Sequence, residues 1–484
     1  MKQAKGWRKL TVTGVSALLF CGAALAVGST SLDERRTTLA DQRSVAVTIY
    51  NENLALVKEV RGVELATGLN RLAVRDVSAM MRPETALLRA LRHPAGLRVL
   101  EQNFDFDLLT PDSLLEKYVG RTVGIVQTHP TTGKETVLRG EVLSAQNGVV
   151  LRIGERIETG IPGRLVFDSV PENLRDRPTL SLLLDNANRG KQELELSYLS
   201  GGLSWRADYV AELAPGDDKL DLTGLITLTN ASGTAYPNAK LQLVAGDVNL
   251  VRERFRDLAE FKGAAMPAAP MVSEEALFEY HLYTLERPTT IADNQTKQVA
   301  LLNAAGVAAR KQLVLEGQNH YYFSSMGELG QKLKLDVMLE FDNNSAAHLG
   351  MPLPKGIVRV YKRDASGNAQ FVGEDAIDHT AKNETVRLKL GQSFDVTADK
   401  TQTDFRSQKG TGRKSEYESA YRIVLKNAKN SPAMVTVREP IPGDWKMVEE
   451  SHPHQKVAAA VAQWQLTVPA EGQLTLSYRV RSHY

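Results

Sequence analysis

The chain has 484 residues, of which 42% are hydrophobic and 24% are charged. These proportions exclude a wholly disordered chain, a collagen and a coiled-coil rod, and the length suits about three globular domains. The formal net charge is only +2, so no charge excess draws the whole chain to nucleic acid, and we expect no nucleic-acid partner.

The first 26 residues have the pattern of a secretory signal peptide. Four basic residues between positions 2 and 9 precede a short apolar run that ends at Ala24-Leu25-Ala26, and such an arrangement is typical of a cleaved signal. We expect cleavage after Ala26 and a periplasmic or secreted bacterial protein without a transmembrane span; the alternative is a retained N-terminal anchor. Cleavage also removes Cys21, the only cysteine, which leaves no disulfide, thiolate metal site or cysteine nucleophile.

Strand patterns begin soon afterwards. Val45, Val47 and Ile49 alternate with smaller or polar residues and predict a strand. The runs 63–65 and 72–74, on either side of a turn at Thr67-Gly68, predict a hairpin. The run 114–118 predicts a short helix capped by Asp112 or Ser113.

Glycine residues divide the segment 119–167 into short apolar runs, such as 123–126 and 149–151. About five short strands separated by glycine turns indicate a small barrel of the SH3 or Sm-like kind. The alternative is a β-meander that belongs to a larger sheet.

From Leu180 onward the alternation of apolar and polar residues becomes strong. It is clearest in 194–198, 333–341 and 474–480, and each run predicts a strand with one solvated face. Few long helical patterns separate these strands, so the fold class is mainly β: a multi-domain set of antiparallel sandwiches, immunoglobulin-like toward the C-terminus, rather than a βαβ enzyme core.

A low-complexity run at 263–270, rich in Ala and Pro, interrupts this pattern and indicates a linker or insertion. Ser273-Glu274-Glu275 then predicts the cap of a short helix that continues to Tyr280. In chain order the predicted parts are a signal peptide (1–26), an N-terminal β-rich region (27–112), a small barrel-like unit (113–170), a first sandwich part (171–250), the linker or insertion (251–286), a second sandwich part (287–410) and an immunoglobulin-like module (411–484).

Six segments are distinctive: 199–209 (LSGGLSWRADY), 228–234 (LTNASGT), 243–248 (LVAGDV), 292–298 (ADNQTKQ), 352–356 (PLPKG) and 373–380 (GEDAIDHT). Together they resemble the bacterial family of unknown function DUF4139. The resemblance covers roughly residues 189–484 and implies a secreted or periplasmic β-rich protein with no assigned activity, so no catalytic residue can be transferred. A distant likeness to mucoidy-inhibitor proteins points to the cell envelope by analogy alone.

The search for chemistry gives few candidates. No serine-nucleophile elbow, H-E-x-x-H or EF-hand pattern is present in the sequence. Glu374, Asp375, Asp378 and His379 form the densest polar cluster, which suits a divalent cation or an acid–base pair. The alternative is a hydrogen-bonded turn, since on a strand Asp375 and Asp378 point to opposite faces. His452-Pro453-His454 offers two imidazoles without a third ligand nearby in the sequence.

Two functions remain open. The first is a non-enzymatic envelope protein whose sandwich modules bind a partner protein or a glycan. The second is a hydrolase of cell-envelope polysaccharide that uses Glu374, Asp375 and Asp378 as its acid–base set. We favour the first, and we expect no cofactor, no metal and no catalytic residue.

Overall fold

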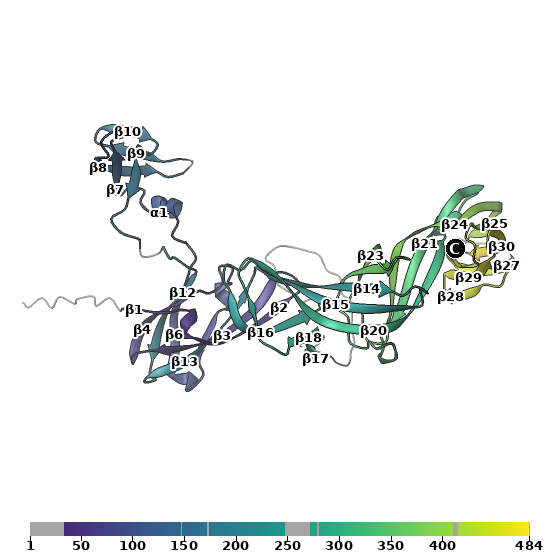
Figure 1. The fold of residues 1–484 in the computed structure, drawn as a ribbon, viewed down its shortest axis with the longest axis horizontal. Helices are drawn as coiled ribbons and strands as arrows, with labels where there is room; N and C mark the ends of the chain where they lie inside the picture. Colours follow the sequence, from purple (N-terminus) through teal and green to yellow (C-terminus); the bar gives the residue numbers. More distant parts are fainter. Residues whose placement is uncertain are drawn as a thin grey trace, which may run out of the picture.

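The computed structural model describes residues 33–146, 148–171, 174–246, 272–277, 280–409 and 415–483. Strands form nearly all of this part of the chain, and its only α-helix is α1 (Pro111–Lys117). The mainly β fold class is therefore confirmed. The molecule is elongated, with the N-terminal strands at one end, the C-terminal strands at the other and a small unit standing apart (Figure 1). The predicted signal peptide lies outside the described residues.

Two sheets form the N-terminal sandwich. Their facing side chains make one core, in which the alternating Leu180, Leu182 and Leu184 of one sheet contribute beside Val47 and Ile49 of the other. The four-stranded sheet has the order β1 (Glu34–Thr37), β4 (Gly68–Arg75), β12 (Thr179–Asn186) and β6 (Leu97–Asp105). The eight-stranded sheet has the order β17 (Val272–Leu277), β18 (Tyr280–Leu285), β16 (Tyr236–Ala245), β2 (Gln42–Tyr50), β3 (Leu54–Glu64), β13 (Lys191–Ser200) and β5 (Leu87–Ala90), with β19 (Thr289–Ile291) beside β16.

The hairpin predicted around Thr67-Gly68 is wrong, because β3 and β4 belong to different sheets. Asn70 closes the connection: its side chain accepts a hydrogen bond from the Ala66 amide and donates to the carbonyl oxygens of Ala66 and Gly68. A side chain bonded to nearby backbone replaces ladder pairing at such a corner. The alternation predicted both strands, but it does not distinguish a hairpin from a crossing between two facing sheets.

A five-stranded unit is inserted between β6 and β12 (Figure 1). It has its own sheet and its own small core, so it is not a meander of a larger sheet. The two edge strands β10 and β11 do not pair, and the sheet is not closed. Helix α1 precedes it, capped by Thr110 instead of Asp112 or Ser113, and buries Leu115 in that core. The order is β10 (Arg156–Thr159), β9 (Val150–Ile153), β8 (Glu135–Ser144), β7 (Thr122–Thr128) and β11 (Arg164–Val166).

A thirteen-stranded sheet forms the middle of the molecule and its C-terminal end. The strands β20, β21 and β24 are long, with 22, 15 and 25 residues. The path is β23 (Ala369–Ile377), β22 (Gly356–Arg363), β14 (Leu203–Leu213), β15 (Lys219–Asn230), β20 (Gln295–Glu316), β21 (Glu328–Asp342), β24 (Thr385–Lys409), β25 (Ser415–Asn427), β30 (Gly472–His483) and β27 (Asp444–Glu450); β26 (Ala433–Pro440), β29 (Val461–Val468) and β28 (Gln455–Ala458) branch from it.

The last strands of this sheet fold back into a second core, which we call the C-terminal sandwich. Side chains of β24, β25 and β30 meet those of β26 and β29, and Trp464 lies fully buried among them. The strands expected at 423–425, 435–437, 464–466 and 474–480 are all present. The strands β20 and β24 pair both with the middle strands and with strands of this sandwich, so the ladder hydrogen bonds continue from the middle of the sheet into it.

The predicted linker 251–286 is only partly described. Residues 247–271 lie outside the described residues. The remaining part contains strands β17 and β18, which pair with each other at the edge of the eight-stranded sheet, in place of the helix expected from Ser273 to Tyr280. The capping motif is local, whereas the edge of a neighbouring sheet stabilises an extended segment through ladder hydrogen bonds.

Gly202 provides a first test of this fold. It joins β13 to β14 with a φ of +78°, and a Cβ built on it would lie 2.6 Å from the Ser232 Cα atom. We expect Gly202→Ala to lower the free energy of unfolding by roughly 2 kcal/mol or more. The left-handed φ is unfavourable for alanine, and the contact of its Cβ with the Ser232 backbone adds a second cost. Gly201→Ala is the matched control, since its nearest neighbour would be Met80 Cε at 3.6 Å. Urea unfolding of both variants measures the difference; equal stability would contradict this account.

Candidate functional site

The predicted polar cluster does not converge on one point. Glu374 and Asp375 are neighbours on β23, and Glu374 forms an ion pair with Arg359 at 3.1 Å. Asp375 instead accepts hydrogen bonds from the backbone amides of Ala376 and Lys389. Among the residues that the structure describes, no group of three or more His, Cys, Asp or Glu side chains could hold a metal ion.

The last two members of that cluster lie in the turn after β23. Asp378 accepts a hydrogen bond from the Thr380 hydroxyl through its carbonyl oxygen, and the His379 ring lies 3.3 Å from the Asn51 side-chain nitrogen. Backbone bonds therefore shape this turn, as in the alternative interpretation of the sequence.

His452 and His454 belong to the C-terminal sandwich. The Nδ1 atom of His454 lies 2.9 Å from a carboxylate oxygen of Glu450, and its ring packs between Trp445 and Trp464. The Nδ1 atom of His452 lies 2.9 Å from the Ser451 hydroxyl. Each imidazole thus has a separate local partner, and the pair does not form a shared site.

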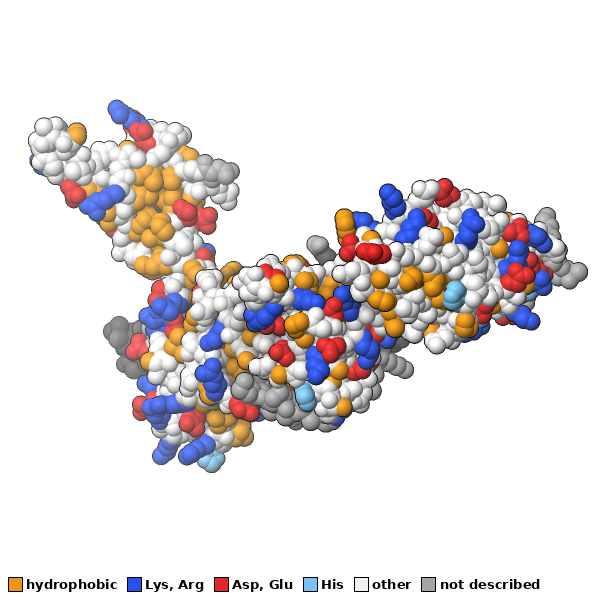
Figure 2. Space-filling model, turned by 45° about the vertical axis from the view of Figure 1, so that its right-hand side comes forward, with side chains coloured by type: hydrophobic (Ala, Val, Ile, Leu, Met, Phe, Trp, Pro, Cys, Tyr) orange, Lys and Arg blue, Asp and Glu red, His pale blue; other side chains and the backbone are white. Residues whose placement is uncertain are grey.

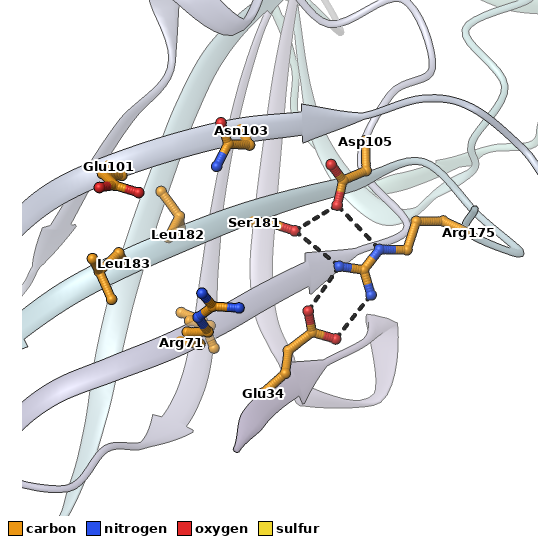
Figure 3. Close-up of a pocket in the computed structure, with 10 residues that line it drawn as sticks. Glu34, Arg71, Glu101, Asn103, Asp105, Arg175, Ser181, Leu182 and Leu183 are labelled. Atoms are coloured by element: carbon orange, nitrogen blue, oxygen red, sulfur yellow. Dashed lines mark hydrogen bonds and ion pairs between the residues drawn. The ribbon is translucent and has the colours of Figure 1, made fainter. Parts of the chain in front are cut away.

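The outer face of the four-stranded sheet carries a hollow of about 280 Å³, and Arg175 lies at one end of it (Figure 3). The guanidinium donates two hydrogen bonds to Glu34, at 2.9 and 2.7 Å, and one to Asp105 at 3.1 Å. The Ser181 hydroxyl donates to the same Asp105 oxygen at 2.8 Å. Two carboxylates therefore balance the charge of the arginine, and the bidentate pair with Glu34 makes the group a structural clamp.

The Arg175 clamp gives a pH-dependent prediction. Hydrogen bonds from Arg175 lower the pKa of Glu34 below its ordinary value of 4.5. A lowered folded-state pKa contributes stability that is present above pH 4.5 and is lost as the pH falls through the folded value. We therefore expect the melting temperature of Glu34→Gln to fall less between pH 5 and 3 than that of the wild type. Glu84→Gln, an exposed acid, is the control for the loss of one carboxylate, and identical acid profiles for both variants would contradict the role of the clamp.

A larger hollow, of about 810 Å³, lies at the end of the N-terminal sandwich. Three parts of the chain supply its walls: the start of β2 with Gly62 of β3, the turn after β5, and the turn between β12 and β13 together with the first residues of β13. We call it the cationic hollow. Its lining residues are Arg43, Gly62, Arg92, His93, Asn188, Arg189, Lys191, Gln192 and Glu193.

Hydrogen bonds fix the two turns of the cationic hollow to each other. The Asn188 side-chain amide donates to the His93 carbonyl oxygen at 3.3 Å and to the Gln192 side chain at 3.1 Å. The Ala187 amide donates to the Gly96 carbonyl oxygen at 2.7 Å. A Cβ on Gly96 would lie only 2.2 Å from the Asn188 Oδ1 atom, so the turns pack closely as well. The hollow is therefore preorganised, without a ligand to shape it.

Positive charge dominates this hollow. Arg43, Arg92, Arg189 and Lys191 are all exposed, and within the described part of the chain none of their side chains has an ion pair or a hydrogen bond. Glu193 is the only acid in the lining. Lys and Arg side chains also gather on the surface at the lower left of Figure 2, where the N-terminal sandwich lies. Because four cations face one carboxylate, the hollow attracts anions.

The sequence interpretation did not identify these residues. They are separated by up to 150 positions, from 43 to 193, and no local motif joins them. The nearest signal is the turn at Arg189-Gly190-Lys191, where two cations flank a glycine, but basic residues in turns are usually solvated surface.

Comparison with known proteins gives one family. The model of the domain of unknown function DUF4139 matches residues 194–484. No curated protein matches the chain. All residues of the cationic hollow precede the matched segment. In addition, no helix among the described residues has the length and apolar character needed to cross a membrane.

Proposed function

The chain belongs to the DUF4139 family, which assigns it no activity, and we propose that it is a non-enzymatic binding protein of the bacterial cell envelope. The pattern of residues 1–26 supports localisation to the envelope, because a basic N-terminal region, a short apolar core and a small-residue cleavage site direct export. The mature chain then starts at Val27 and works in the periplasm or outside the cell.

The observation that carries this proposal is the cationic hollow, a preorganised site without a catalytic pair. Hydrolysis of a glycosidic bond ordinarily needs two carboxylates that flank the bond, and Glu193 is the only one in the lining. Two of the carboxylates that the sequence suggests for a hydrolase, Glu374 and Asp375, are held by separate partners. A fixed hollow with charge but no acid–base pair suits binding.

Retention of the mature protein on an isolated envelope fraction tests this proposal. Gly62→Leu adds an apolar side chain to the hollow without altering its charge. The added Cβ lies 3.2 Å from Arg43 Nε and 3.2 Å from Lys191 Cε, so these two flexible side chains are displaced. Thr229→Leu adds the same side chain at an exposed strand position of β15 and is the control. We expect the wild type and the control to be retained and Gly62→Leu to lose about tenfold in retention.

Three results would overturn the proposal: no retention of the wild type, equal retention of Gly62→Leu, or release of soluble glycan fragments by the wild type. Mass spectrometry of the protein recovered from the periplasm or the medium identifies its N-terminus and so tests the proposed export separately. An intact Met1 or a purely cytoplasmic pool contradicts export.

A further inference from the structure

We infer that the cationic hollow binds an acidic glycan, a polysaccharide whose repeating units carry carboxylate or phosphate groups. This inference rests on the proposed function, since it names the ligand of the same site. Four features of the hollow support it. They are the position over Gly62 where Arg43 and Lys191 meet, which we call the seat, the excess of cations, the absence of an aromatic lining and the size.

In the seat, the side chains of Arg43 and Lys191 lie over Gly62 of β3. A Cβ at this position would be 3.2 Å from both Arg43 Nε and Lys191 Cε, with Arg43 Nη2 at 3.5 Å. The arginine and lysine side chains therefore both lie over the bare backbone of Gly62, close to the same point. Two like charges held so close repel each other, and an anionic group that contacts both of them reduces that repulsion.

The remaining cations extend this charge beyond a single seat. Arg92 and Arg189 come from the two turns that Asn188 joins, so their backbone positions are fixed relative to the seat. Guanidinium groups bind carboxylates and phosphates through paired hydrogen bonds. A ligand with several anionic groups along its length can therefore contact the seat and the turns together.

The lining contains no Phe, Tyr or Trp. Proteins that bind single-stranded nucleic acid stack the bases on aromatic rings, and the hollow offers no such surface. The affinity must come from charge and from hydrogen bonds, which favours an anionic chain without bases. The volume of about 810 Å³ is near the upper end of small-molecule sites, which span roughly 300–1,000 Å³, so it accepts a few sugar units instead of a single ion.

The test is direct binding of the full mature protein to defined polymers by isothermal titration calorimetry. The probes are polygalacturonate for carboxylate, a phosphorylated lipopolysaccharide core oligosaccharide and its dephosphorylated form for phosphate, dextran as the neutral glycan and a single-stranded DNA oligonucleotide. We expect one acidic glycan to bind, dextran to fail and the DNA to bind at least tenfold more weakly. Raising the salt from 50 to 200 mM should weaken binding about tenfold or more.

A matched pair of double variants assigns the binding to the hollow. Arg43→Gln/Lys191→Gln removes the two cations of the seat, and we expect at least a tenfold loss of affinity. Arg82→Gln/Lys219→Gln removes the same charges from exposed positions outside the lining and should bind like the wild type. Both pairs should unfold at the same temperature as the wild type.

Each outcome decides the inference. Binding to polygalacturonate or loss of binding on dephosphorylation supports it and identifies the anionic group. Equal binding of dextran, tighter binding of DNA, or equal losses in the two double variants would overturn it. If the acidic glycans fail while Gly62→Leu still abolishes retention on the envelope fraction, the inference falls and the proposed binding function stands.

Discussion

Replacing Arg61 with methionine is expected to lower the stability of the N-terminal sandwich by about 3–5 kcal/mol, because it leaves a buried carboxylate without its partner. Arg61 and Glu59 are each only 3% exposed, and their side chains lie 2.9 Å apart on β3. The Arg61 guanidinium also donates to the carbonyl oxygens of Thr37 and Arg75. It thereby ties β3 of one sheet to the ends of β1 and β4 in the other.

Hydrogen exchange of the β3 and β4 amides measures this effect, since it reports local opening in a molecule of several parts. A loss of this size accelerates exchange by more than about a hundredfold. Arg89→Met is the control, because its ion pair with Glu195 is half exposed and is worth at most about 1 kcal/mol. The double variant Glu59→Leu/Arg61→Met should recover most of the exchange protection. Equal exchange in Arg61→Met and Arg89→Met would show that the buried pair does not join the sheets.

A loss of similar size, about 3–5 kcal/mol, is expected in the C-terminal sandwich for Lys400→Met. Lys400 and Glu439 are 2% and 0% exposed, and the ammonium lies 2.6 and 2.7 Å from the two carboxylate oxygens. Glu439 also accepts a hydrogen bond from the Tyr322 hydroxyl at 2.8 Å. Without the lysine, that hydroxyl is the remaining partner of a fully buried charge.

Urea unfolding followed by tryptophan fluorescence measures this loss, because Trp464 is part of the same core. Lys426→Met is the control, since its ion pair with Asp399 on the same sheet is largely exposed. Lys400→Met/Glu439→Gln removes both charges and should regain part of the stability. Equal stability of Lys400→Met and Lys426→Met would contradict the structural role of this buried ion pair.

The strands were largely predictable because a half-buried strand has an apolar residue at every second position. Val45, Val47 and Ile49 alternate in the sequence, and the structure buries all three. Pairing was less predictable. A hairpin of β3 with β4 and a crossing between two sheets require the same alternation of apolar residues. Which of the two arrangements forms depends on pairing with β12 and β13, more than 100 positions away.

The site was harder still to predict. The polar residues of Glu374–His379 are close together in the sequence. However, successive side chains of a strand point to opposite faces, so the side chains of Glu374 and Asp375 point away from each other. The cationic hollow has the opposite character. Arg43 and Lys191 are far apart in the sequence and meet only because β13 pairs with β3 at Gly62 and Val63. Tertiary pairing creates such a site, and no local pattern contains it.

The five-stranded unit leaves and rejoins its host at a single point. Asp105, at the end of β6, pairs with Thr179, at the start of β12, and a bridge between Leu108 and Arg175 holds the two connections together. Gain or loss of the whole unit in one genetic event therefore preserves every ladder bond between β6 and β12. The host sheet can therefore accept a short turn, a different domain or a longer insertion at this point without losing its strand pairing.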